Sequence, residues 1–513
     1  MEKLPRLLVF IVAYDAETTI RQVLRRIPTE LSAEFDVEIL IIDDGSQDAT
    51  FAAGLHAGRS AGLPFKLTVL YNPVNQGYGG NQKIGYHYAL EGNFDYVALL
   101  HGDGQYAPER LPQLVGLLHD APADVGAVFG SRMLEPRDAR KGGMPLYKYV
   151  GNRILTVIQN RLLGTRLSEF HSGYRVYAVR ALRRIPFDRN TKDFHFDTEI
   201  IIQLTFAKQR IIEHPIPTYY GDEICRVKGF KYAYNVLRAS LQAYLQRFYL
   251  FYDRRFDCEP AESGRRYPSK LQFDSTHSRV YELISPGARV LDLGAGDGSL
   301  GAALTQRKNC QVTGVDIEWS YLSAHLHRFV IADLDHGIPD VGDQSFDYVL
   351  ALDLVEHLAS PEDFLDELRR LTAAWPDARI VATTGNVGFI LTRLLLLLGR
   401  FEYGRRGVLD LTHRRLFTFA TFRRALNSAG FTIERCEGIV PPLPFVFGAS
   451  AAGSLLMKIA KTLVRLRPTI FAFQCLIVAR PDPTLQMLLA RAEAAAFAKH
   501  DPVAVQWQKR EYR

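Results

Sequence analysis

The sequence predicts an α/β protein made of two consecutive domains, each built around a mostly parallel β-sheet. Three observations support this fold class. The chain has 513 residues, and at about 100–200 residues per domain this length favours two or three domains. Short apolar runs alternate with segments of helical periodicity, which is typical of strand–helix–strand units. The alternation stops near residue 255 and resumes near residue 289, so we expect a domain boundary between them.

In the first half, apolar runs of strand length are followed by helical patterns. The expected buried strands are Leu7–Ala13, Val37–Ile42, Lys66–Tyr71 and Tyr96–Leu100. After the first of them, Ile20, Val23, Leu24 and Ile27 recur at the i, i+3, i+4, i+7 spacing of one buried helix face. Ligands of such sheets bind at the carboxyl ends of the strands, so the loops after these strands are where we expect a site.

The middle of the chain is typical of a linker. The segment Arg254–Lys270 is polar and contains Pro260, Gly264 and Pro268, which interrupt regular structure. The second half repeats the alternation, with strands expected at Arg289–Leu293, Gln311–Val315, Tyr348–Leu352 and Arg379–Ala382. The alanine-rich C-terminus favours a helix. We expect domains at residues 1–255 and 275–480, a linker at 256–274 and a helical tail at 481–513.

The composition excludes several classes of protein. Hydrophobic residues make up 47% of the chain and charged residues 23%, which is ordinary for a globular protein and excludes disorder or collagen. The net charge of +6 is too small to indicate nucleic-acid binding, but it fits an anionic substrate or an acidic membrane surface. The five cysteines form no CxxC pair, so neither a zinc site nor a disulfide framework is expected, and a reducing cytoplasm is favoured.

Two further features bear on localisation. No secretory signal peptide is predicted, because Asp15 interrupts the short apolar run that precedes it. No continuous apolar stretch is long enough to cross a bilayer. The nearest candidate, Gly438–Met457, is uncharged, but three prolines break its first half, so we expect it to be interfacial or buried, with a transmembrane span as the alternative.

Polar residues follow each predicted strand of the first half. They include Asp15 after the first strand, Asp43 and Asp44 after the second, Asn75 to Asn81 after the third, and Asp103 and Gln105 after the fourth. Carboxylates at strand ends can bind a base or ribose, and a carboxylate beside a carboxamide can hold a hard divalent cation shared with substrate phosphates. Gly77 in the third loop lets the backbone approach a phosphate. The pattern favours a nucleotide diphosphate sugar, although each motif alone is also typical of a turn or helix cap.

Taken together, these motifs resemble the family 2 glycosyltransferases with a GT-A fold, over about residues 5–250. The residues that carry the resemblance are Phe10–Asp15, Ile41–Ser46, Asn75–Gly77 and Gly102–Gln105. Gly130–Arg132 and Ser172–Arg175 are similar to the polyprenyl-phosphate branch, typified by dolichol-phosphate mannosyltransferase. The roles that the resemblance implies are nucleotide contact for Asp15 and Asp44, binding of Mg²⁺ or Mn²⁺ and the diphosphate for Asp103 and Gln105, and acceptor-phosphate contact for Arg132 and Arg175.

One position departs from this family pattern. The family usually carries an acidic residue two positions before the metal-binding aspartate, and this chain has His101 there. A neutral imidazole can still hydrogen-bond or bind a metal, so metal dependence stays open. The family's reaction is an inverting displacement at the anomeric carbon. A hydroxyl acceptor needs a general base, for which Asp197 and Glu199 are candidates, whereas a phosphate acceptor needs cations such as Arg132 and Arg175.

The second half contains the sharpest motif of the chain. Asp292, Gly294, Gly296 and Gly298 form the pattern D-x-G-x-G-x-G between a predicted strand and a helix. A dinucleotide fingerprint would need its third glycine at Ser299. The motif instead resembles the class I S-adenosylmethionine-dependent methyltransferases, with a Rossmann-like fold, over about residues 275–480. The roles that this resemblance implies are cofactor binding by the glycine loop, ribose binding by Asp316 and adenine contact by Asp333.

The sequence leaves the methylation base and the acceptor contacts open. Displacement at a sulfonium methyl needs an aligned nucleophile, and a sugar hydroxyl also needs a base, for which His357 and His413 are candidates, although a lone histidine is more often structural. The apolar stretch Phe389–Leu398 fits an acceptor lid, a membrane contact or simple packing. The segment Tyr232–Phe256, rich in aromatic residues and arginine, fits a membrane face or packing on the sheet.

The combined interpretation is a bifunctional enzyme, with a nucleotide-sugar-dependent glycosyltransferase followed by an S-adenosylmethionine-dependent methyltransferase. Both would act on one glycan or glycolipid precursor, with a polyprenyl phosphate or glycan as acceptor and without nucleic acid. The expected location is the cytoplasm, peripheral to the inner face of the plasma membrane. The alternatives are a transferase that extends a polysaccharide through a base such as Asp197, and a nucleotide-binding scaffold in which one or both domains are inactive.

Overall fold

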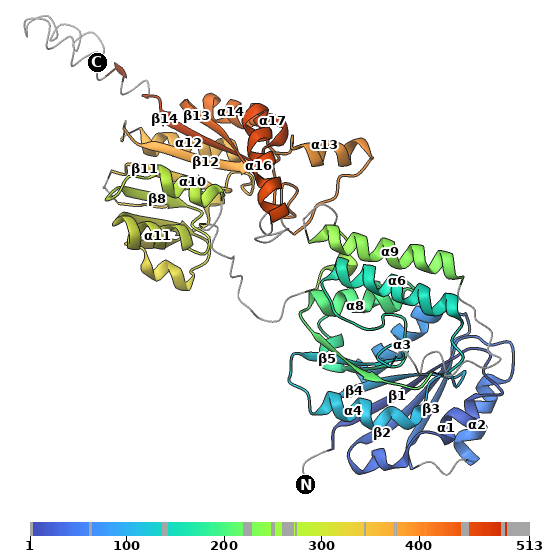
Figure 1. The fold of residues 1–513 in the computed structure, drawn as a ribbon. Coiled ribbons are helices and arrows are strands. Elements are labelled where there is room, and N and C mark those ends of the chain that lie inside the picture. The colour runs from blue at the N-terminus through green and yellow to red at the C-terminus, as the bar shows by residue number, and fades with distance from the viewer. Residues whose placement is uncertain are drawn as a thin grey trace, which may run out of the picture. The chain divides into compact units, whose positions relative to one another are not determined.

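The computed structural model describes residues 4–60, 64–135, 142–218, 228–247, 252–258, 271, 274–342, 345–373, 375, 377–405, 407–442, 451–483 and 488–489. The chain divides into two compact units, Met1–Ser263 and Gly264–Arg513 (Figure 1). Each unit contains a seven-stranded mixed sheet with helices packed on it. The predicted fold class, α/β with two successive domains, is therefore confirmed.

The sheet of the first unit has the strand order β3-β2-β1-β4-β6-β5-β7. Its strands are β1 (Arg6–Ala13), β2 (Asp36–Asp43), β3 (Lys66–Tyr71), β4 (Tyr96–His101), β5 (Val125–Ser131), β6 (Arg175–Ala178) and β7 (Arg210–Pro215). The first four pair parallel with one another and agree with the predicted strands to within one residue. The short β6 is antiparallel to both β4 and β5, so the sheet is mixed. The sequence of β6 has no clear apolar periodicity, and this strand was not predicted.

Helices cover this sheet and form a further layer. They are α1 (Ile20–Arg25), α2 (Thr50–Ser60), α3 (Tyr78–Glu91), α4 (Leu111–His119), α6 (Leu146–Leu163), α7 (Val179–Leu182), α8 (Phe196–Phe206) and α9 (Gly229–Gln246). α3 packs on β1, and α9 packs against both α6 and α8 (Figure 1). α3 approaches the sheet closely because Gly85 lies against Phe10: a Cβ at position 85 would come within 2.1 Å of that ring.

The sheet of the second unit has the order β10-β9-β8-β11-β12-β14-β13. Its strands are β8 (Arg289–Leu293), β9 (Gln311–Asp316), β10 (Arg328–Ile331), β11 (Tyr348–Leu352), β12 (Arg379–Gly385), β13 (Phe431–Ile439) and β14 (Gln474–Pro481). The first five pair parallel with one another, and β14 pairs antiparallel with both β12 and β13. The four predicted strands are all present.

The helices of the second unit are α10 (Thr276–Leu283), α11 (Ser299–Lys308), α12 (Pro361–Thr372), α13 (Ile390–Leu397), α14 (Phe419–Ser428), α16 (Ala451–Leu466) and α17 (Pro468–Phe471). Local sequence explains where several begin. Pro361 opens α12, with Glu362 in the first turn and Arg370 in the last, and both charges complement the helix dipole. Thr418 caps α14 by accepting a hydrogen bond from the N–H of Thr421 at 3.2 Å.

Parts of the predicted organisation lie outside the described residues. These include most of the linker at 256–274, nearly all of the tail at 481–513, and residues 443–450 within Gly438–Met457. The predicted domain limits therefore stay predictions. Among the helices that the structure describes, none has the length and apolar character needed to cross a bilayer.

The contact between Gly85 and Phe10 generates a stability prediction. We expect Gly85→Ala to lower the free energy of unfolding of the first unit by about 1–3 kcal/mol, because the added methyl group overpacks the core. Gly116→Ala in α4 is the matched control, since a Cβ there meets nothing within 4 Å among the described residues and should stabilise the helix by about 0.5–1 kcal/mol. Thermal unfolding of both variants tests this, and equal melting temperatures would contradict it.

Candidate active sites

The first candidate site lies at the carboxyl edge of β2, β1 and β4. β1 pairs in parallel register with both neighbours up to its last residues, so the three strands end together. The loops that carry Asp15, Asp44 and Asp103 therefore leave the same edge of the sheet. The predicted gathering of these polar loops at one rim is confirmed, while the roles of the individual side chains stay predictions.

Asp44 is 3% exposed and holds the loop after β3 in place. Its Oδ1 accepts hydrogen bonds from Asn72 Nδ2 at 2.8 Å and from the N–H of Gln76 at 2.9 Å. Its backbone carbonyl accepts from Asn75 Nδ2 at 2.8 Å. A buried carboxylate needs such partners, so Asp44 shapes the loop beside the expected nucleotide site. Direct contact with a nucleotide stays a prediction.

Asp15 links the loop after β1 to the loop after β2. It is exposed and adopts a left-handed backbone conformation with φ +49°. Its N–H donates to Ser46 Oγ at 2.9 Å, and its Oδ1 accepts from the N–H of Gln47 at 3.2 Å. The carboxylate of Asp15 is thus fixed at an open position where a ligand hydroxyl can donate to it.

Gly77 serves a close approach within the protein. It has φ +78°, and a Cβ there would lie 2.7 Å from the backbone carbonyl oxygen of Lys192. Gly79, in the first turn of α3, donates its N–H to the same oxygen at 2.8 Å. This packing is sufficient to explain the glycine at position 77, and the predicted approach to a phosphate stays a prediction.

Asp103 and Gln105 offer an incomplete set of metal ligands. Asp103 is exposed, and its Oδ1 accepts from the N–H of Gln105 at 3.0 Å. Their side-chain oxygens are of the type that Mg²⁺ and Mn²⁺ prefer. Within the part of the chain that the structure describes, no three or more His, Cys, Asp or Glu side chains are grouped to hold a metal ion. A cation here would need further ligands from substrate phosphates or water.

His101 is packed as a neutral ring. Its Nε2 lies 3.3 Å from Tyr78 Oη, and a Cβ on Gly173 would come within 2.6 Å of the same nitrogen. Burial lowers the pKa of His101, although the nearby Asp103 acts in the opposite direction. The imidazole therefore adds no negative charge where the family usually has an acidic side chain.

Arg175 lies in the core beneath this site. It is 0% exposed, and its guanidinium donates to the backbone carbonyls of Ser172, Phe170 and Asp197 at 2.8, 2.9 and 3.0 Å. It also lies 3.4 Å from Asp197 Oδ1, whose other oxygen accepts from Tyr78 Oη at 3.0 Å. The resemblance implied that Arg175 faces an acceptor phosphate. In this structure its donors are directed to internal acceptors, and the contact with an acceptor phosphate stays a prediction.

Arg132 is held by a carboxylate to which the sequence pattern gave no role. Its guanidinium forms an ion pair with Glu169, and its Nη2 donates to the carbonyl of His171 at 3.2 Å. Burial alone would raise the pKa of Glu169, but Arg132 and a hydrogen bond from Asn152 keep that pKa below its usual value. Only 12% of the Arg132 side chain is exposed, so its predicted contact with an acceptor phosphate would compete with this ion pair.

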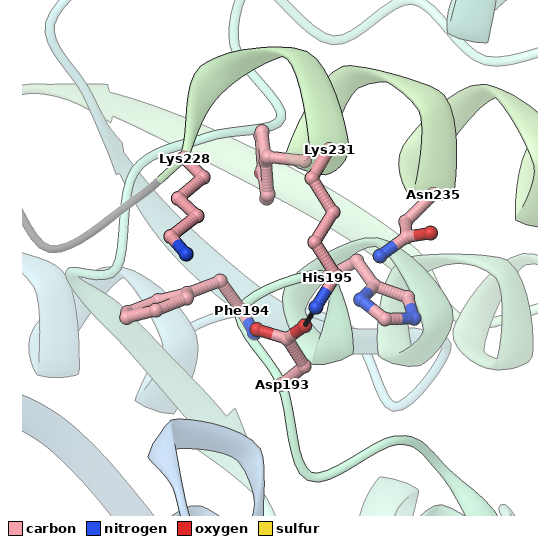
Figure 2. Close-up of a pocket in the computed structure, with 7 residues that line it drawn as sticks. Asp193, Phe194, His195, Lys228, Lys231 and Asn235 are labelled. Atoms are coloured by element: carbon pink, nitrogen blue, oxygen red, sulfur yellow. Dashed lines mark hydrogen bonds and ion pairs between the residues drawn. The ribbon is translucent and has the colours of Figure 1, made fainter.

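A pocket of about 210 Å³ adjoins these residues, between the start of α8 and the first turns of α9 (Figure 2). It is lined by Asp193, Phe194, His195, Lys228, Lys231, Tyr232 and Asn235. Phe194 stacks on Tyr78 with 5.2 Å between ring centroids, and Tyr232 Oη lies 2.8 Å from His171 Nδ1. The pocket is thus separated from His101 and Asp197 by the ring of Tyr78. The lysines of this pocket were not among the predicted site residues, although Lys231 directly precedes the predicted segment Tyr232–Phe256.

The second candidate site lies at the carboxyl edge of β8, β9 and β11. After β8 the backbone turns through Gly294, Gly296 and Gly298, with φ of +74°, +58° and +75°. The N–H groups of Gly294 and Ala295 donate to the carbonyl of Val315 at 2.8 and 3.0 Å. Among the described residues nothing lies within 4 Å of the position that a Cβ on Gly296 would take. The turn is therefore open to a ligand at this glycine.

Acidic side chains surround this turn. Asp316, at the end of β9, accepts from the N–H of Gly296 at 2.7 Å through Oδ2, which fixes its carboxylate beside the open glycine. Asp292 in β8 is 3% exposed, and burial together with Asp316 raises its pKa to about 7. Asp333 caps a short turn by accepting from the N–H of Asp335 at 3.0 Å. The ribose and adenine contacts of these residues stay predictions.

The two predicted bases of the second half lie side by side. The ring centroids of His357 and His413 are 4.7 Å apart. His357 Nδ1 lies 3.3 Å from the carbonyl oxygen of Thr412, and His413 Nδ1 lies 3.1 Å from that of Val408. Burial, followed by the nearby His357, lowers the pKa of His413, so its ring is neutral near pH 7. A neutral imidazole that donates from Nδ1 leaves Nε2 free to accept a proton.

Glu356 is an acid of this site to which sequence reasoning gave no separate role. It is 2% exposed. Its Oε1 accepts from the N–H of Gly385 at 3.1 Å, whereas its Oε2 is buried without a hydrogen-bond partner among the described residues. Burial, with Asp353 as the second cause, raises the pKa of Glu356 to about 8. The carboxyl group is therefore protonated at neutral pH.

α13 has an unusual distribution of apolar residues. Thr392 is its buried residue, whereas Leu394, Leu396 and Leu397 are 47%, 58% and 82% exposed. Simple packing, one of the three explanations for Phe389–Leu398, does not account for leucines that face outward. The acceptor-lid and membrane-contact explanations stay open.

Comparisons with known proteins assign a family to each half. Residues 8–185 match the family model "Glycosyl transferase family 2", and residues 265–435 match the model "Methyltransferase domain". The undecaprenyl-phosphate mannosyltransferase of Micrococcus luteus is 28% identical over 182 residues, which cover 35% of this chain and 70% of that protein. The UDP-N-acetylglucosamine–dolichyl-phosphate N-acetylglucosaminyltransferase of Methanococcus voltae is 27% identical over 246 residues, covering 45% of this chain and 94% of that protein.

Among solved structures, the UDP complex of glucosyl-3-phosphoglycerate synthase from Mycobacterium tuberculosis aligns with a TM-score of 0.37 and 17% identity, over 49% of this chain and 82% of that one. From the two family matches, the chain carries a family 2 glycosyltransferase domain at its N-terminus and a methyltransferase domain at its C-terminus. The second domain implies S-adenosylmethionine as cofactor. The open glycine turn with Asp316 beside it fits a nucleoside cofactor.

The raised pKa of Glu356 generates a pH prediction. A carboxyl group with a higher pKa in the folded state stabilises that state fully below its unfolded pKa of 4.5, and this contribution is lost as the pH rises through about 8. Glu356→Gln removes the titration. We therefore expect the melting temperature of the variant to rise relative to wild type between pH 5 and pH 9, by about 5 °C. A constant difference across this range would contradict the prediction. Comparison with wild type cancels Asp292, whose pKa is raised in the same direction.

Proposed function

We propose that this chain is a bifunctional enzyme. Its first half transfers a sugar, of the hexose type and with inversion, from a nucleotide-sugar to a polyprenyl phosphate. Its second half transfers a methyl group from S-adenosylmethionine to a glycan or related acceptor, and both halves act on one glycolipid precursor. The observation that carries the lipid acceptor is the inverted surface of α6.

α6 turns polar residues toward the protein and apolar residues outward. Its buried residues are Asn152, Thr156, Gln159 and Leu163, and its exposed apolar residues include Leu146, Tyr147, Val150, Ile154 and Val157, which are 45–74% exposed. A helix on a water-exposed surface normally has the reverse pattern. An outward apolar face beside a glycosyltransferase site supports contact with lipid.

α9 extends this apolar surface. It packs along α6, and its Phe230 and Tyr234 are 98% and 65% exposed. Lys228 and Lys231 lie at the start of the same helix. Cationic side chains beside an outward apolar face are typical of helices that bind anionic lipid surfaces. The pair of helices supports peripheral association with the inner face of the plasma membrane.

At the donor end, we propose that Asp15 and Asp44 bind the nucleotide and that Asp103 and Gln105 bind a divalent cation with the diphosphate. Mg²⁺ or Mn²⁺ would neutralise charge on the leaving diphosphate. An acceptor phosphate is already anionic, so it needs no general base. Its oxygen must instead be held in line with the bond to the diphosphate, which is a positioning problem. Such an in-line attack inverts the anomeric carbon.

A hydroxyl acceptor that relies on Asp197 as base is the alternative. The Asp197 side chain is 8% exposed and already engaged by Tyr78 and Arg175, which gives it little freedom to approach a substrate hydroxyl. Asp197→Asn with full activity would exclude this role. The inactive-scaffold alternative is tested by calorimetry with nucleotide-sugar and metal, followed by a turnover assay: binding without turnover would support it.

In the second half, S-adenosylmethionine supplies an electrophilic methyl group when bound. The chain's own residues would hold it and prepare the acceptor. The turn from Gly294 to Gly298 leaves room for the cofactor, and we propose that Asp316 binds its ribose and Asp333 its adenine. His413, with His357 beside it, is the proposed base that accepts the acceptor's proton at Nε2. The exposed leucines of α13 support a lipid-linked acceptor for this reaction too.

The lipid acceptor is tested by incubating the full chain with labelled nucleotide-sugars, Mg²⁺ or Mn²⁺, and vesicles that contain polyprenyl phosphate. We expect label in the organic extract, together with release of the nucleoside diphosphate. Label that appears only in soluble sugar or polysaccharide would overturn the lipid acceptor. A screen of different nucleotide-sugars in the same assay identifies the transferred sugar and the nucleotide base of the donor.

The two activities should be separable by single substitutions. We expect Asp103→Asn to lower sugar transfer by about 100-fold or more, because a charged ligand of the diphosphate site is lost, while methyl release from S-adenosylmethionine is unchanged. Asp316→Asn should lower methyl transfer from S-adenosylmethionine and leave sugar transfer unchanged. Each variant is the folding control for the other. Loss of both activities in either variant would contradict two independent sites.

A further inference from the structure

We infer that the pocket between α8 and α9 binds the phosphate monoester of the acceptor, and that Lys228 and Lys231 are its cationic ligands. This inference rests on the proposed sugar transfer to a phosphorylated lipid. The sequence motifs predicted two arginines, Arg132 and Arg175, as the contacts of the acceptor phosphate. They did not indicate the residues of this pocket.

The pocket has the size and composition of an anion site. Its volume is about 210 Å³, and Lys228 and Lys231 extend into it from the first turn of α9, above Asp193 and Phe194 (Figure 2). Asn235, one turn further along the helix, adds an amide. α9 has 18 residues, and among the residues that the structure describes no side chain caps its N-terminus. The positive end of its dipole lies on the same side as the lysines.

The balance of charge in the pocket favours an anion. Lys231 Nζ lies 3.8 Å from Asp193 Oδ2, with 69% and 41% of the two side chains exposed, so this ion pair is long and open to solvent. Burial lowers the pKa of His195, which leaves that ring neutral, and its Nδ1 is buried without a partner among the described residues. Two lysines against one carboxylate leave a surplus of one positive charge for a phosphate.

The two arginines expected to bind the acceptor phosphate already have partners within the protein. Arg175 is fully buried, with three donors on backbone carbonyls. Arg132 pairs with Glu169, whose side chain is 0% exposed. Turning Arg132 toward a ligand would leave a buried carboxylate without its partner, which is strongly unfavourable. The lysines of α9 are not held in this way within the described part of the chain, because Lys231 has a long contact with Asp193 and Lys228 is exposed.

The pocket also lies between the proposed sugar-donor site and the apolar surface proposed to bind the prenyl chain. On one side, Phe194 stacks on Tyr78, whose hydroxyl reaches His101 and Asp197. On the other side, the fully exposed Phe230 lies between the two lysines in the sequence. A phosphate held here would lie next to the Tyr78 ring, across from His101 and Asp197, while its prenyl chain would leave along the apolar faces of α9 and α6.

The decisive measurement separates the acceptor from the donor. In the full chain, we expect the double variant Lys228→Gln/Lys231→Gln to raise the KM for polyprenyl phosphate by about 10–100-fold, as for loss of charge-assisted hydrogen bonds, with the KM for nucleotide-sugar unchanged. Lys231→Arg should retain most of the affinity. Lys458→Gln, an exposed lysine of α16 in the second unit, is the matched control. An unchanged acceptor KM, or an equal rise in donor KM, would overturn the inference.

Binding arms identify the source of the phosphate and keep this inference distinct from the proposed function. Calorimetry with a short, water-soluble isoprenyl phosphate and with inorganic phosphate tests the monoester itself, and vesicles of phosphatidylglycerol test a lipid phosphodiester. We expect the monoesters to bind wild type and to lose affinity in the double variant. Binding to phosphatidylglycerol alone would overturn the inference. If wild type transfers no sugar to polyprenyl phosphate, the proposed function fails, and monoester binding that the double variant abolishes would still uphold the pocket.

Discussion

Both candidate sites depend on the parallel register of three central strands. In the first unit β2, β1 and β4 end together, and in the second β9, β8 and β11 are paired in the same way. Because parallel strands share one carboxyl edge, loops distant in the chain meet there without further design. The buried carboxylate of Asp44 and the carboxylate of Asp316 then fix the neighbouring loops by accepting backbone N–H groups. Any slip of this pairing would separate the acids that define each site.

The polar interior of the first unit explains its apolar exterior. Asn152 of α6 donates to Glu169, which holds Arg132, and Gln159 of the same helix donates to Thr198 at the start of α8. The inner side of α6 must therefore be polar, because buried polar groups need partners. Its apolar residues are left on the outer side. The proposed lipid surface and the buried network around Arg132 are thus formed by two faces of one helix.

The sequence was most informative where backbone periodicity and loop chemistry coincide. Apolar runs located β1 to β4 and β8 within a residue, and the glycine pattern after β8 resembled that of methyltransferases, in agreement with the family model matched there. It was least informative about side-chain direction. Nothing in the motif around Arg175 indicates that its guanidinium points inward, because its partners are mainly backbone carbonyls supplied by the fold. Likewise β6 and β14 enter their sheets antiparallel through long-range pairing that no local pattern encodes. The roles inferred for Glu169 and for the lysines of α9 depend on contacts between segments that are distant in the sequence, so they could not be predicted from local patterns.

The two proposed reactions do not require a channel that leads the product of the first active site to the second. Each unit carries its own outward apolar helices, α6 and α9 in the first and α13 in the second, so each can meet a lipid-linked substrate at the same kind of surface. Attachment of one unit to a bilayer raises the effective concentration of the other at that bilayer, by the same reasoning that applies to linked binding modules. On the proposed function, a glycolipid product of the first site would stay in the membrane, and diffusion in two dimensions would return it to the second site. On this argument the covalent fusion and the lipid acceptor support each other, since a freely soluble product would gain far less from the fusion.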